Sequence, residues 1–134
     1  MTDRRVFLQT TAVAASAVAL GSVTSVFASS PSYPGVVYTK EQPGQWAKKV
    51  ASHAPEVEVK GGNVSLVTRH GMSAEHYIVR HTLVLADGTV VGGKTFAPSD
   101  KPASSFTLPA AYKGEVFATS FCNKHDFWVT KFTV

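Results

Sequence analysis

After residue 56 the chain is a series of short β-type runs divided by turns, and this alternation constrains its fold most. The runs are rich in Val, Ile, Thr, Phe and Tyr, which pack well on a pleated sheet. Asp87-Gly88 is a typical two-residue hairpin turn, and Gly92-Gly93 indicates a β-bulge. The expected strands are residues 57–60, 64–68, 76–85, 89–95, 106–108, 115–121 and 127–134. The spacing predicts an all-β fold, an immunoglobulin-like antiparallel β-sandwich of about seven strands.

The segment before these strands is expected to contribute little regular structure. Residues 29–45 are rich in proline and glycine and contain one short strand-like run at 36–39. One or two helical turns are expected at 46–50, and Pro55 ends any helix near His53.

Residues 1–28 are expected to be a signal peptide. Residues 4–8 read Arg-Arg-Val-Phe-Leu, an apolar run follows, and residues 26–28 form a small-x-small cleavage site. This pattern resembles a twin-arginine (Tat) signal, although Asp3 and Gln9 depart from its first and last positions. The resemblance implies export of the folded protein to the periplasm. The alternatives are an ordinary Sec signal, or a retained membrane anchor if the segment is not cleaved.

Length and charge exclude some classes of protein. With 134 residues the chain has room for one domain, which we place at residues 46–134 after an N-terminal extension at residues 29–45. The formal net charge of +4 comes without a Lys/Arg run or interleaved aromatic residues, so nothing supports nucleic-acid binding. A mild positive charge favours encounter with an anionic substrate.

The single cysteine, Cys122, cannot form an internal disulfide, so it is a metal ligand, a reactive thiol or a core residue. His125 follows three residues later, and a thiolate and an imidazole at this spacing can reach one metal ion. Three more histidines, His53, His70 and His76, lie in loops or at strand ends, where binding residues concentrate. These five residues are the candidate metal ligands.

His81 differs from the other histidines because it lies inside the strand expected at residues 76–85. Alternation would place Tyr77, Val79, Leu83 and Leu85 on its side of the sheet. We expect His81 to be a packed or surface histidine and not a ligand.

A thiolate with several imidazoles suits zinc, copper or iron. Structural zinc takes four ligands, which one cysteine and three histidines would supply. Blue copper is weakly supported, because no methionine follows His125 and the chain has only Met1 and Met72. Five ligands would leave an octahedral ion one open position, and an open position implies a site at which a reaction takes place.

Three segments carry a family resemblance. Residues 70–78 read His-Gly-Met-Ser-Ala-Glu-His-Tyr-Ile, residues 122–128 read Cys-Asn-Lys-His-Asp-Phe-Trp, and residues 51–55 read Ala-Ser-His-Ala-Pro. They resemble the superoxide reductase motifs His-Pro-Met-x-x-Glu-His-Tyr-Ile, Cys-Asn-x-His-Gly-x-Trp and Glu-Lys-His-x-Pro, those of the desulfoferrodoxin/neelaredoxin iron-binding domain. The resemblance runs from Trp46 to the C-terminus.

The resemblance implies a mononuclear, non-haem Fe2+/Fe3+ centre that reduces superoxide to hydrogen peroxide with an electron from an external donor protein. It assigns an equatorial plane to four histidines and the axial thiolate to Cys122; the histidines are His53, His70, His76 and His125. It also implies a homotetramer. Two alternatives remain: a non-enzymatic periplasmic sandwich that binds iron, senses or transfers electrons, and a structural zinc domain.

The chain departs from the family where Ala51-Ser52 replaces Glu-Lys before the first histidine. In the family, that lysine is thought to attract superoxide and help protonate the product. Lys48 or Lys49, one helical turn earlier, and Lys124 are the candidates to supply this charge.

Overall fold

The computed structural model describes residues 33–134, so the expected signal peptide at residues 1–28 lies outside the described residues. Within residues 33–134 no helix is long and apolar enough to cross a bilayer. The elements in chain order are β1 (Val37–Tyr38), η1 (Gly44–Lys49), α2 (Val50–His53), β2 (Glu56–Lys60), β3 (Asn63–Val67), β4 (Ile78–Leu85), β5 (Val90–Thr95), β6 (Ala103–Thr107), β7 (Glu115–Cys122) and β8 (Asp126–Thr133).

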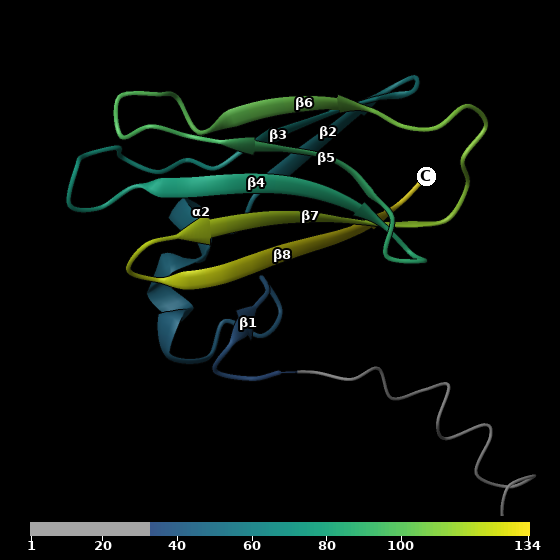
Figure 1. The fold of residues 1–134 in the computed structure, drawn as a ribbon. Coiled ribbons are helices and arrows are strands. Elements are labelled where there is room, and N and C mark those ends of the chain that lie inside the picture. Colours follow the sequence, from purple (N-terminus) through teal and green to yellow (C-terminus); the bar gives the residue numbers. More distant parts are fainter. Residues whose placement is uncertain (1–32) are drawn as a thin grey trace, which may run out of the picture. The chain divides into compact units, whose positions relative to one another are not determined.

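The strands form two sheets, as Figure 1 shows. One sheet has the order β1-β8-β7-β4-β5 and the other has the order β2-β3-β6. The pairings are antiparallel except for β1, which lies parallel to β8 with Tyr38 opposite Trp128. The predicted all-β sandwich is therefore confirmed. β1 lies within the strand-like run expected at residues 36–39, and only its parallel pairing with β8 was not predicted.

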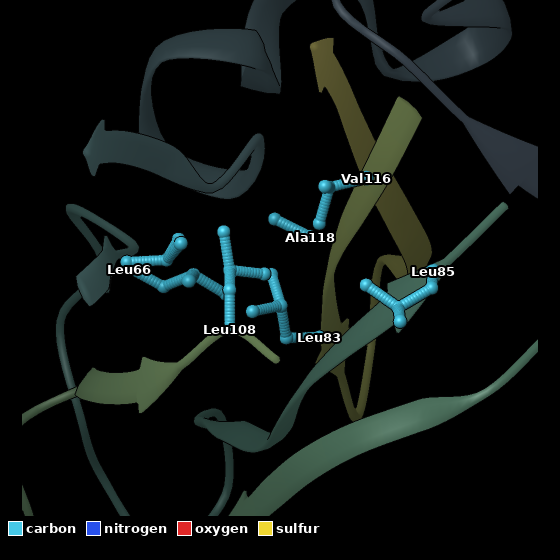
Figure 2. Close-up of a cluster of buried hydrophobic side chains, with 7 residues drawn as sticks. Leu66, Leu83, Leu85, Leu108, Val116 and Ala118 are labelled. Carbon is cyan, nitrogen blue, oxygen red and sulfur yellow. The ribbon is translucent and has the colours of Figure 1, made fainter. Parts of the chain in front are cut away.

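Alternate side chains of β3, β4 and β7 build the main core between the sheets. Figure 2 shows this cluster, in which each strand contributes every second residue. The buried members are Val64, Leu66, Leu83, Leu85, Leu108, Val116 and Ala118. Burial of one such aliphatic side chain stabilises the fold by about 1.5–3 kcal/mol.

Two β-bulges interrupt the pairing of β4 with its neighbouring strands. The predicted one lies opposite Leu83/Val84, where Val91 is the extra residue on β5, and its neighbour Gly92 has no room for a side chain because a Cβ would lie 2.7 Å from the Phe106 ring. The second bulge, between Ile78 and Arg80 against β7, was not predicted. It makes Val79 the extra residue, so the expectation that Tyr77 and Val79 share the side of His81 was wrong.

Three segments meet at one end of the sandwich (Figure 1). They are the η1–α2 segment, the loop between β3 and β4, and the tight turn between β7 and β8. All five candidate ligands come from these segments.

Candidate metal centre

His53 is the last residue of α2, and local chemistry fixes its ring. The helix ends there because Ala54 is extended, with ψ of 123°, and Pro55 follows. The Nδ1 atom of His53 lies 2.8 Å from Ser52 Oγ and 3.2 Å from the Lys49 carbonyl oxygen. Since a carbonyl only accepts, Nδ1 carries the proton and Nε2 is left free to bind a metal.

Asn123 joins the loop of His76 to the turn of Cys122 and His125. Its side chain accepts a hydrogen bond from Tyr77 N at 3.0 Å and donates one to the Glu75 carbonyl at 3.0 Å. Its backbone N–H donates to the Tyr77 carbonyl at 3.2 Å. The sequence motif contained Asn123, but its connecting role was not predicted.

The turn after β7 carries the thiol and the last histidine. Cys122 ends β7, is 1% exposed, and pairs with Asp126 across the turn. Asp126 adopts a φ of +66°, the left-handed region that favours glycine, and the family motif has glycine at this position. The turn is further fixed by Trp128, whose Nε1–H donates to the His125 carbonyl at 2.9 Å.

The four imidazole nitrogens trace three sides of a square. Nδ1 of His125 lies 3.0 Å from Nε2 of His53 and 3.0 Å from Nε2 of His76. Nε2 of His76 lies in turn 3.0 Å from Nε2 of His70. Four nitrogens bound at about 2.1 Å around one ion, at right angles, are separated by about 3.0 Å along each side. The spacing therefore fits a metal ion at the centre of the four rings.

The thiol lies beside this square. Cys122 Sγ is 3.6 Å from His125 Nδ1 and 3.9 Å from His70 Nε2. The ligand atoms of all five residues lie within 4.8 Å of one another. The structure thus brings together every ligand that the sequence predicted.

The site keeps its histidines neutral, which a metal ligand requires. Burial lowers the pKa of His53 to about 4, with further lowering by His70 and His125. Burial also lowers the pKa of His70, His76 and His125, and each of them is lowered further by a neighbouring histidine or lysine. At neutral pH all four rings are therefore free of the second proton that would exclude a metal.

Two of the three candidate lysines place positive charge near the ligands. Lys49 contributes to lowering the pKa of His70, His76 and His125, and Lys124 contributes for His76 and His125. Lys48 instead lines a surface groove with Lys40 and Phe132.

Aromatic rings pack against two of the candidate ligands. The Trp46 ring meets the His125 ring edge-on at 4.7 Å between centroids, and its Nε1–H donates to Asp126 Oδ2 at 3.3 Å. The ring of buried Trp128 lies 5.9 Å from that of His53. The contact of Trp46 with His125 was not predicted, because it joins segments far apart in the chain.

Comparisons with known proteins agree with this arrangement. A family model described as Desulfoferrodoxin matches residues 44–131. A comparison with curated proteins found no match.

Three solved structures illustrate the similarity. The superoxide reductase (neelaredoxin) from Ignicoccus hospitalis is 25% identical, with a TM-score of 0.65 over 78% of this chain and 98% of that chain. The superoxide reductase from Treponema pallidum is 31% identical, with a TM-score of 0.50 over 60% of this chain and 66% of that chain. The superoxide reductase (1Fe-SOR) from Giardia intestinalis is 21% identical, with a TM-score of 0.57 over 62% and 98%, and supports the fold alone.

Proposed function

Because the chain belongs to the desulfoferrodoxin family, we propose that it is a superoxide reductase, an oxidoreductase that adds one electron and two protons to superoxide and releases hydrogen peroxide. The observation that carries the proposal is the cluster of four imidazole nitrogens and one thiol sulfur within 4.8 Å of one another. Two of the solved structures, at 25% and 31% identity, bear the name superoxide reductase.

The donor set favours iron over structural zinc. A closed structural zinc site takes four ligands, whereas this cluster offers five. A mononuclear iron ion that cycles between Fe2+ and Fe3+ would supply the transferred electron when bound, and an external electron donor would replace it. The residues that would hold it are His53, His70, His76, His125 and Cys122.

Positive charge next to the ligands has two suppliers. Lys49 and Lys124 both act on the ligand histidines through their charge, and we assign them the attraction of the superoxide anion. Their ammonium groups also carry protons of the kind that the product requires. Lys48 stays a predicted candidate without a comparable supporting observation.

We also propose where the protein works and how it assembles. The Tat-like segment at residues 4–8 supports export to the periplasm, where the electron donor would be found, and the family resemblance supports a homotetramer. Cell fractionation would locate the protein, and light scattering of the purified protein would give its mass.

The product stoichiometry tests the function. With superoxide generated steadily and an electron donor present, a reductase forms one hydrogen peroxide per superoxide consumed, whereas dismutation forms one per two. A ratio of one supports the proposal. If the iron-loaded protein consumes no superoxide beyond the spontaneous rate, it is the non-enzymatic alternative, which the replacement of the family Glu-Lys by Ala51-Ser52 favours.

A further inference from the structure

A chain of buried polar side chains crosses the core next to the metal centre. His81 on β4 is fully buried, and its Nδ1 lies 2.8 Å from Ser104 Oγ while its Nε2 lies 2.8 Å from Thr68 Oγ1. Thr68 Oγ1 lies in turn 2.8 Å from Ser120 Oγ. The four residues, which we name the His81 network, are His81, Ser104, Thr68 and Ser120, and none is more than 9% exposed.

The His81 network connects the two sheets. Ser104 lies on β6 of the three-stranded sheet, and Thr68 directly follows β3 of the same sheet. His81 and Ser120 are paired neighbours on β4 and β7 in the five-stranded sheet. Leaving one buried polar partner unpaired costs about 1–3 kcal/mol, so the network specifies how the sheets face each other.

Burial also decides how many protons the His81 ring carries. It lowers the pKa of His81 to about 4, with a smaller contribution from Lys94, so the ring is neutral with one N–H. Ser120 is fully buried, and within residues 33–134 its hydroxyl has Thr68 as its side-chain partner. The neutral His81 ring therefore donates a hydrogen bond at one nitrogen and accepts one at the other, with the hydroxyls of Thr68 and Ser104 as its two partners.

Two members of the network each precede a candidate metal ligand by two residues in the sequence. Thr68 precedes His70 by two residues, and the His70 backbone N–H donates to the Thr68 carbonyl at 2.8 Å. Ser120 precedes Cys122 by two residues on β7, so both side chains face the core. The two segments thus meet twice, at the Thr68–Ser120 hydrogen bond and at the 3.9 Å contact between Cys122 Sγ and His70 Nε2.

We propose that Thr68, Ser120 and His81 are positioning residues for the metal centre. Their hydrogen bonds set the separation between the Cys122 thiolate and the His70 imidazole, and so control how tightly the thiolate binds the ion. The inference rests on the iron centre of the proposed function but not on its reaction with superoxide.

Two variants remove the hydrogen bonds between Thr68 and its partners, and three others are controls. Thr68→Val keeps the shape and removes the hydroxyl, and Ser120→Ala removes only the bond to β7. Thr68→Ser restores the hydroxyl. Thr119→Val breaks the matched Thr82–Thr119 hydroxyl pair on the same two strands, and Leu108→Ala destabilises the core outside the network.

The readouts are the rate at which a chelator removes iron, the thiolate-to-iron charge-transfer band of the oxidised protein, and the unfolding free energy of the metal-free protein. We expect about tenfold faster iron loss and a shifted band in Thr68→Val and Ser120→Ala. Thr68→Ser, Thr119→Val and Leu108→Ala should keep the wild-type band, whatever their stability.

The proposal is overturned if Thr68→Val and Ser120→Ala lose stability but keep the wild-type band and rate of iron loss, because the network would then serve the fold alone. Should Thr68→Val fail to fold, Ser120→Ala decides by itself. A wild-type protein without any charge-transfer band contradicts the iron centre itself, which separates failure of the proposed function from failure of this inference.

Discussion

Asn123 and Tyr77 exchange two hydrogen bonds, from Tyr77 N to Asn123 Oδ1 at 3.0 Å and from Asn123 N to the Tyr77 carbonyl at 3.2 Å. Tyr77 follows the candidate ligand His76, and Asn123 follows the candidate ligand Cys122. These bonds therefore hold the two ligand-bearing loops together independently of any metal. A site fixed in this way loses little conformational entropy when it binds an ion.

Removing the Asn123 side chain should loosen the centre. We expect Asn123→Ala to weaken iron affinity about tenfold, because Tyr77 N and the Glu75 carbonyl both lose their partner. Competition with a chelator measures this. Asn63→Ala is the matched control, because Asn63 also pairs through its side chain, with Thr107, but lies outside the ligand segments. Equal affinities for wild type and Asn123→Ala would contradict the positioning role.

Replacing Cys122 should remove the sulfur signature. Cys122→Ser keeps the size of the side chain but has no thiolate, so the oxidised protein should lose its visible charge-transfer band. We also expect slower reaction with superoxide, because the thiolate donates electron density to the ion. Visible spectroscopy with metal analysis checks this at equal iron content. Persistence of the band in Cys122→Ser would exclude Cys122 as the iron ligand, and stoichiometric zinc in the wild type would point to the structural zinc alternative.

Protonation of His81 should make stability depend on pH. Its pKa is about 4 in the folded protein against 6.5 ordinarily, so between these values the unfolded chain binds more protons. The contribution is complete above pH 6.5 and is lost as the pH falls toward 4. The loss is on the order of 3 kcal/mol.

Urea unfolding of the metal-free protein at pH 7.5 and pH 5 measures this dependence. The comparison of wild type with His81→Gln isolates His81, because the four ligand histidines titrate in both proteins. We expect a smaller loss of stability between the two pH values in His81→Gln. The same loss in both proteins would show that His81 is not buried as a neutral ring.

Lysine variants test the attraction of superoxide. We expect Lys49→Ala and Lys124→Ala each to lower the second-order rate constant several-fold, and to weaken its dependence on ionic strength, because a screened charge has been removed. Lys113→Ala, an exposed lysine just before the start of β7, is the control. Rate constants that fall equally in all three variants would indicate a general effect of net charge.

The candidate ligands could be predicted from the sequence, whereas the contacts that hold them in place could not. Residue chemistry and spacing along the chain indicated all five candidate ligands. His70 and His76 share one short segment, Cys122 and His125 share another, and His53 lies just before Pro55 in a third. The contacts of Asn123 with Tyr77 and of Trp46 with His125 join segments that are distant in the sequence, so no pattern within one segment indicates them. These contacts depend on how three segments assemble at one end of the sandwich.

The same distinction holds for the fold. Alternation of apolar residues predicted the strands, and His81 is a packed histidine as expected, but alternation failed for Tyr77 and Val79, which do not share the side of His81. The bulge at Val79 shifts the register of β4 by one residue, and a shift of one reverses which face each side chain takes. The parallel pairing of β1 with β8 could not be predicted either, because a strand of two residues is too short to show an alternation of apolar residues.

The rate of superoxide decay on the reduced protein tests the central claim most directly. Pulse radiolysis of the iron-loaded ferrous protein should show superoxide disappearing in a second-order reaction far faster than its spontaneous decay, while the charge-transfer band of the ferric centre appears. The metal-free protein should show only the spontaneous rate. Superoxide that decays at the spontaneous rate with the iron-loaded wild type would contradict the assignment as a superoxide reductase.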